Sequence, residues 1–157
     1  MESENNHAVR DKYRRAAERC ACFHFRKASR AVTQLYDEVL QPTGLRSTQL
    51  VILIAISLHE QISPARLARE LVMDRSTLVR NLKPLEKRGL VSTRPGKDRR
   101  TRTIELTELG EGELTRAIPY WEKAQEHFER NLGEQHWEEM LRGLSSAVTI
   151  SRERPRS

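Results

Sequence analysis

The sequence of 157 residues is poor in cysteine and has no long apolar run. Its two cysteines, Cys20 and Cys22, are too few for a scaffold held by disulfides and are typical of a reducing compartment. No stretch approaches the roughly 18 apolar residues of a membrane-spanning helix. Residues 1–7 are polar and do not lead into the apolar segment of a signal peptide. We therefore expect a cytoplasmic protein with no membrane association.

Motifs of common enzyme chemistry are absent as well. The chain has no glycine-rich phosphate loop, no distinctive pair of carboxylates and no recognisable Ser/Cys–His arrangement. Cys20 and His24 have a spacing that could share a metal, but no other histidine adds a third ligand. On one helix Cys20 and Cys22 would point about 200° apart and could not bridge each other. The sequence predicts no enzyme, no cofactor and no metal site.

Positive charge is concentrated in the middle of the chain. The net charge is +6, yet residues 45–107 hold 13 basic and 6 acidic side chains, whereas residues 108–150 hold 4 basic and 9 acidic. A local excess of this kind is the electrostatic footprint expected of a nucleic-acid partner. A membrane surface would also attract it, but the aromatic and basic amphipathic pattern of membrane-surface helices is missing.

Two short helices are predicted within residues 63–89. Ser63 followed by a proline is typical of a capped helix start, and Asp74 can cap a second helix. The core face of that second helix is predicted to carry Leu78, Leu82 and Leu85. Residues near the start of the second helix reach base edges in helix-turn-helix proteins. The candidate DNA contacts on this helix are Arg75, Ser76, Thr77, Arg80, Asn81 and Lys83.

A basic hairpin follows, with strands predicted over residues 90–94 and 103–106 and a turn around Pro95 and Gly96. Asp98 stands among its basic residues, and we expect it to pair with an arginine and fix its direction. Such charge runs are usually solvated surface, but beside two paired helices this one predicts DNA contact. The basic candidates at the hairpin tip are Lys97, Arg99, Arg100 and Arg102.

The end of the hairpin resembles the wing signature Asp-x-Arg-x-x-x-aliphatic-x-Leu-Thr-x-x-Gly of MarR-family regulators. The matching residues run from Asp98 to Gly110, and the preceding residues 85–91 resemble the end of the family's recognition helix. The resemblance, over about residues 20–150, implies a winged helix-turn-helix in a mainly α homodimer that binds inverted-repeat operators in double-stranded DNA. It implies that Arg100 enters the minor groove with Asp98 supporting it, and leaves the other basic tip residues to phosphates.

The remaining segments are predicted as helices over residues 13–40, 47–58 and 109–132 and a last one up to about residue 150, with loose ends at 1–10 and 151–157. We expect a single domain with a small β-hairpin wing. Its DNA-binding lobe would span 45–107, and its dimerisation helices would span 12–44 and 108–150. The broad apolar faces of these outer helices favour a two-fold dimer over packing within one chain alone.

The effector is left open by the sequence. Residues 22–36 resemble the first helix of the organic-hydroperoxide-sensing branch of the family, which implies a reactive Cys22 with Tyr36 reaching it across the dimer. Ser47 stands where that branch has a second tyrosine, and Arg26 where it has an aromatic residue. The family more broadly implies a small aromatic or anionic effector. Residues of the kind that such a pocket uses are Phe23, Arg26, Arg30 and Trp121. A winged-helix module for protein or RNA is a further alternative.

Overall fold

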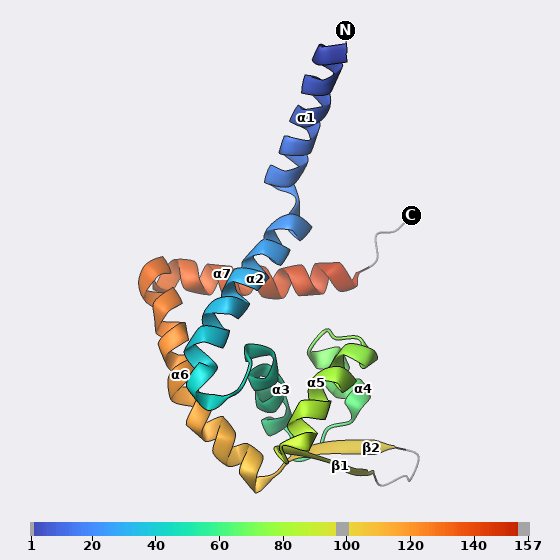
Figure 1. Cartoon of the computed structure of the whole chain (residues 1–157), viewed down its shortest axis with the longest axis vertical. Helices are drawn as coiled ribbons and strands as arrows, with labels where there is room; N and C mark the ends of the chain where they lie inside the picture. Colours follow the sequence, from blue (N-terminus) through green and yellow to red (C-terminus); the bar gives the residue numbers. More distant parts are fainter. Residues whose placement is uncertain (1, 97–100, 154–157) are drawn as a thin grey trace.

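The computed structural model describes residues 2–96 and 101–153. The elements are α1 (Glu2–Arg19), α2 (Ala21–Leu40), a 3₁₀ turn η1 (Gln41–Thr43), α3 (Ser47–Ser57), α4 (Pro64–Glu70), α5 (Arg75–Lys87), β1 (Val91–Pro95), β2 (Arg102–Leu106), α6 (Glu108–Leu132) and α7 (Glu134–Arg152). Figure 1 shows α1 extending away from the rest of the molecule, with the hairpin near the opposite end. The mainly α fold with one small hairpin is confirmed.

A break at Cys20 divides the first predicted helix in two. Cys20 has extended backbone angles (φ −77°, ψ 110°) and stands at the N-cap of α2, while α1 begins as early as Glu2. The predictions of one helix over 13–40 and of a loose start are therefore wrong. Neither glycine nor proline marks this break, so it could not be predicted from the residue pattern. Cys20 and Cys22 do not lie on one continuous helix, so the predicted angle of about 200° between their exposed thiols does not hold.

The core lies mainly within residues 45–107, around α3. Helix α3 is apolar along its length, and five of its residues are buried, as expected for its run of aliphatic residues. The helix starts predicted at Ser63 and Asp74 are confirmed, because the Ser63 hydroxyl accepts from the N–H of Arg66 and the Asp74 carboxylate from that of Thr77. The fully buried side chains around α3 include Leu67, Leu78, Leu85, Leu90 and Ile104.

The hairpin is longer than predicted. Strands β1 and β2 pair antiparallel from Val91 opposite Leu106 to Pro95 opposite Arg102. Pro95 and Arg102 are therefore strand residues rather than turn residues, which corrects their predicted place at the tip. Ile62 adds a further antiparallel bridge, since its N–H and carbonyl both bond the backbone of Ile104 at 3.0 and 2.8 Å.

The hairpin is joined to α6 by a close approach at Gly110. Thr107 caps α6 by accepting from the N–H of Gly110 (3.0 Å), and its hydroxyl donates to the carbonyl of Gly89 (2.6 Å). The N–H of Thr107 donates to the carbonyl of Leu90 (3.2 Å). A Cβ on Gly110 would lie 1.9 Å from that same carbonyl oxygen, so only glycine fits. The segment Leu106–Gly110 therefore joins the end of α5, the hairpin and the start of α6.

The terminal helices leave much apolar surface uncovered. Helix α7 contacts mainly α6 and has no buried residue, although apolar side chains recur along it. The more exposed of these are Met140, Leu141, Leu144, Val148 and Ile150. In the described part of the chain no single helix is long and apolar enough to cross a membrane. Only α2 with η1 (Ala21–Thr43) and α3, bent by 77° at their junction, pass that test as a pair, and α3 is a core helix here.

Candidate nucleic-acid interface

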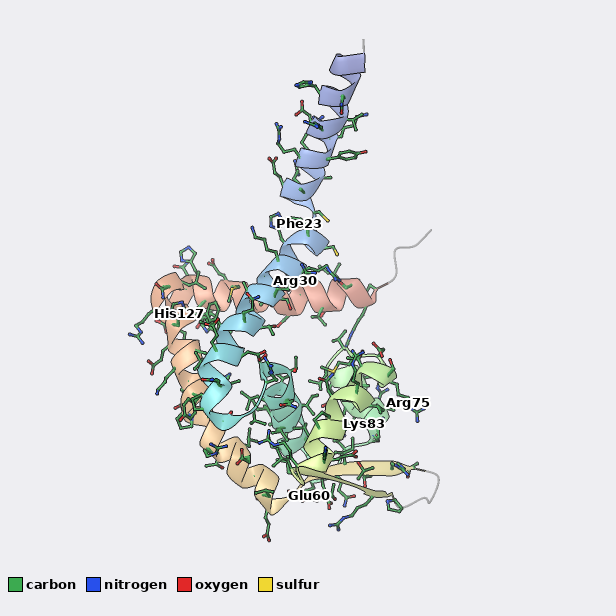
Figure 2. All side chains as sticks on the ribbon, viewed as in Figure 1. Phe23, Arg30, Glu60, Arg75, Lys83 and His127 are labelled. Atoms are coloured by element: carbon green, nitrogen blue, oxygen red, sulfur yellow. The ribbon has the colours of Figure 1, made fainter. Side chains whose placement is uncertain are left out.

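The outward side of α5 presents a set of polar residues that we call the reading face: Arg75, Ser76, Thr77, Arg80, Asn81 and Lys83. Three leucines on the other side bury α5 in the core, and this fixes which side faces outward. Thr77 and Asn81 are half-buried, and the other four side chains are exposed. Figure 2 shows Arg75 projecting from the start of α5 at the outer edge of the lobe. The helix residues predicted as DNA contacts are thus all at least partly accessible at the surface.

Asp74 organises the N-terminal end of this face. Its carboxylate accepts the hydroxyl protons of Ser76 (2.6 Å) and Thr77 (2.8 Å) together with the N–H of Thr77 (2.7 Å). These bonds, that of Ser76 first, hold the pKa of Asp74 far below its ordinary value, so the carboxylate stays charged at any working pH. Asn81 donates to the carbonyl of Thr77 (2.8 Å), and Arg80 lies 3.5 Å from the Thr77 hydroxyl.

Several basic residues of the lobe are paired with acids and are less free to bind phosphate. Arg66 pairs with Glu70 at 2.9 Å, and Arg46 pairs with Asp37 at 3.2 Å. Among the ion pairs of the described residues, none involves the basic members of the reading face. Their charge is therefore available to an external anion.

The hairpin carries an exposed arginine that was not among the predicted DNA contacts. Arg94 on β1 is 68% exposed and pairs with Glu105 on β2 at 2.9 Å. Strand alternation could have placed it on the same side as its partner. Arg102 is exposed at the start of β2, while Lys97, Asp98, Arg99 and Arg100 lie outside the described residues.

A polar cluster holds the DNA-binding lobe against the outer helices. Glu113 on α6 accepts from Arg116 (2.7 Å) and lies 3.5 Å from Arg88 at the end of α5. Both arginines also donate to carbonyls of the segment between α2 and α3. Arg88 bonds Gly44 at 3.0 Å, and Arg116 bonds Thr43 at 2.9 Å. The cluster therefore connects the end of α5 to the α2–α3 segment and to α6.

An apolar cavity of about 340 Å³, which we call the α2–α3 pocket, lies between the lobe and the outer helices. Met73, in the turn before α5, and Trp121 of α6 both line it. The other lining residues are Val32, Thr33, Tyr36, Ser47, Thr48, Leu50, Val51 and Ile54. Nothing in the sequence pointed to Met73, because the pocket joins segments that are far apart in the chain. Its volume is within the range of small-molecule sites.

The predicted effector residues do not all come together. Tyr36 and Trp121 line the α2–α3 pocket, whereas Phe23, Arg26 and Arg30 are exposed on α2 and line no part of it. Figure 2 shows Phe23 near the α1 end of α2, away from the DNA-binding lobe.

Tyr36 donates its phenol proton to Gln125 at 2.5 Å, and burial, followed by the charge of Glu129, raises its pKa. Cys22 precedes Tyr36 by 14 residues on one helix, a rise of roughly 21 Å, so the two cannot meet within one protomer. The described residues contain no cluster of three or more His, Cys, Asp or Glu side chains that could hold a metal.

The fold and its exposed reading face are those of a winged helix-turn-helix protein, and comparisons with known proteins specify the family. A sequence model of the MarR family matches residues 43–101. The transcriptional regulator MosR of M. tuberculosis, solved in complex with DNA, is 35% identical with a TM-score of 0.74, over 85% of this chain and 98% of its own. This chain belongs to the MarR family of winged helix-turn-helix regulators.

Other relatives agree with this membership. The HTH-type transcriptional regulator SarZ of Staphylococcus aureus is 36% identical over 90 residues, which make up 57% of this chain and 61% of SarZ. The chain thus spans about 61% of the length of the curated relatives that it matches. A variant of MarR from E. coli, complexed with operator DNA, shares the fold at 20% identity, with a TM-score of 0.77 over 85% of this chain and 97% of that one. The relatives named here are transcriptional regulators, not enzymes.

Proposed function

We propose that this protein is a homodimeric repressor that binds an inverted-repeat operator in double-stranded DNA. The observation that carries this proposal is the reading face, whose polar and basic residues are exposed on one helix held in the core by three leucines. An α-helix of this kind fits the major groove, and its N-terminal residues reach base edges. The name of one relative, MosR in complex with DNA, supports the same role.

The wing completes the contact in this proposal. Arg100, with Asp98 beside it in the chain, reaches the minor groove, while Lys97, Arg99 and Arg102 bind phosphates. Two observations support this arrangement: Arg102 on β2 is exposed, and the close joint at Gly110 holds the start of the hairpin against α6.

The dimer is supported by the uncovered apolar surface of the outer helices. Phe23 and Phe25 on α2 are 51% and 45% exposed, and several apolar side chains of α7, among them Leu144 and Ile150, are exposed as well. Exposed apolar area of this extent is typical of an interface. A second copy that packs the same helices against it would place two reading faces about one turn of DNA apart, roughly 34–36 Å.

The test is binding to duplex DNA as a function of salt. A random-sequence duplex library selected with the purified protein should yield an inverted repeat, and affinity for it should fall steeply as salt rises. Affinity that is equal for all sequences, or absent at low ionic strength, would contradict the proposal. A single-stranded RNA of the selected sequence serves as the control for an RNA-binding module.

The α2–α3 pocket is the proposed effector site. The lining residues that the structure describes are apolar or neutral, with hydroxyl groups from Thr33, Tyr36, Ser47 and Thr48. We therefore expect a neutral, largely apolar or aromatic effector rather than the anion that Arg26 and Arg30 suggested. Because Met73 of the α4–α5 turn lines the pocket, a ligand there would shift the start of the recognition helix and release DNA.

Oxidation of Cys22 is the alternative signal. The favouring observation is that Cys20 and Cys22 are both exposed beside the break between α1 and α2, where an oxidant can reach them. If Cys22 is the switch, peroxide releases DNA from the native protein but not from Cys22→Ser. Equal release from both proteins would remove Cys22 as the sensor.

A further inference from the structure

We propose that Asp74 sets the hydrogen-bonding polarity of the reading face, so that Ser76 reads a base that presents an exocyclic amino group in the major groove, adenine or cytosine. This inference rests on the proposed function, because it assumes that α5 lies in the major groove. It names a specificity-determining pair that the wing signature does not include.

The polarity follows from the bonds that Asp74 accepts. A hydroxyl has one proton to donate, and an ionised carboxylate can only accept. The hydroxyl of Ser76 donates its proton to Oδ1 of Asp74, with 2.6 Å between the two oxygens, and the hydroxyl of Thr77 donates to Oδ2 over 2.8 Å. Both hydroxyls therefore face outward with lone pairs only. Donation to DNA instead would break a charge-assisted bond, which is about twice as strong as a neutral one.

A hydroxyl that offers only lone pairs cannot bind the hydrogen-bond acceptors of DNA. Phosphate oxygens only accept, and so do N7 and O6 of guanine and O4 of thymine in the major groove. The groups that donate there are the amino groups of adenine at N6 and of cytosine at N4. Ser76 is exposed and can approach such a group, whereas Thr77 is half-buried and already accepts a long contact of 3.5 Å from Arg80. Ser76 is therefore the reader, and Thr77 positions Arg80.

Selection from a random-sequence duplex library tests the proposal with native protein, Ser76→Ala and Asp74→Gly. Native protein should select adenine or cytosine at one position of each half-site, and Ser76→Ala should lose that preference alone. Glycine is also well tolerated at helix N-caps, so Asp74→Gly should stay folded. This change removes the oxygen that accepts the Ser76 proton, so guanine or thymine should now be accepted at that position.

A base analogue that lacks only the amino group gives the quantitative test. In native protein, replacing the selected adenine with purine, or the selected cytosine with 2-pyrimidinone, should weaken binding by roughly 2- to 12-fold, the effect of one neutral hydrogen bond. In Ser76→Ala the same replacement should change nothing, which is the coupling that a double-mutant cycle detects. Ser57→Ala is the matched control, because that exposed serine lies on α3 and bonds the carbonyl of Ile54.

The proposal is overturned if the base that depends on Ser76 is guanine or thymine, if no position changes in Ser76→Ala, or if Asp74→Gly keeps the native preference. Failure of the proposed function gives a different result, because then no duplex is selected by the native protein at all. Circular dichroism of each variant confirms that the compared proteins are folded.

Discussion

The joint at Gly110 gives a sharp prediction about how the wing is held. In Gly110→Ala the added Cβ would lie 1.9 Å from the carbonyl oxygen and 2.9 Å from the carbonyl carbon of Leu90. Both are backbone atoms, so the contact is relieved only by moving α6 away from the start of the hairpin. Overpacking of this kind costs about 1–3 kcal/mol of the free energy of unfolding.

Gly112→Ala is the matched control on the same helix. Nothing lies within 4 Å of a Cβ at Gly112, and alanine there should raise the free energy of unfolding by about 0.4–1 kcal/mol by restricting the unfolded chain. The two variants should therefore differ by about 1–3 kcal/mol in the free energy of unfolding, which is the cost of the close contact at Gly110. Helix propensity favours alanine equally at both positions, so it cancels in the comparison.

Urea unfolding at one fixed protein concentration measures the difference, because the stability of a dimer depends on concentration. With a slope of about 1–3 kcal/mol per molar urea, the two midpoints should lie about 1 M apart. Gly110→Ala should also bind operator more weakly, since Leu90 leads from the recognition helix into β1. Equal midpoints for the two variants would refute the reasoning about the joint.

Three further predictions concern binding, acid stability and assembly. Arg80→Ala and Arg100→Ala should both weaken operator binding in a fluorescence anisotropy titration, but only Arg80→Ala should relax base preference, by about 1–3 kcal/mol at one position; equal losses on every sequence from both variants would contradict this division. The hydrogen bond from His59, then that from Arg66, lowers the pKa of Glu70. This stabilisation is complete above the unfolded pKa and is lost as pH falls through the folded one, so Glu70→Gln should lose less stability than native protein between about pH 5 and 3; parallel acid unfolding curves would exclude it. Leu144→Glu, on the uncovered side of α7, should give monomers in sedimentation, whereas the control Lys123→Glu on α6 should not; an unchanged dimer would exclude α7 from the interface.

The sequence predicts best those features that depend on neighbouring residues. The caps at Ser63 and Asp74, the buried face of α5 and the hairpin follow from short-range hydrogen bonding and periodicity, and the structure confirms them. The break at Cys20 escaped prediction because an apolar period continues across it without a glycine or proline. The hairpin was predicted too short at Pro95, since proline is more often a turn residue than a strand residue.

In the candidate site, too, the parts that depend on neighbouring residues could be predicted and the parts that depend on distant segments could not. The reading face lies on one helix and could be read from one stretch of sequence, whereas the α2–α3 pocket joins Val32, Met73 and Trp121 from three distant segments. Arg26 and Arg30 are of the right chemical type for an anion site, but the structure leaves them exposed on α2. Tertiary packing, rather than residue type, decides which of the candidates meet.

In the proposed complex, two protomers present their α5 helices to one face of the same duplex. Mass measurement of the complex tests this, on the selected operator and on a copy with five base pairs inserted between its half-sites. Two chains should bind the native operator, and this complex should be lost on the insertion, because half a turn moves one half-site to the opposite face of the DNA. One chain per operator, or equal binding to both duplexes, would contradict it.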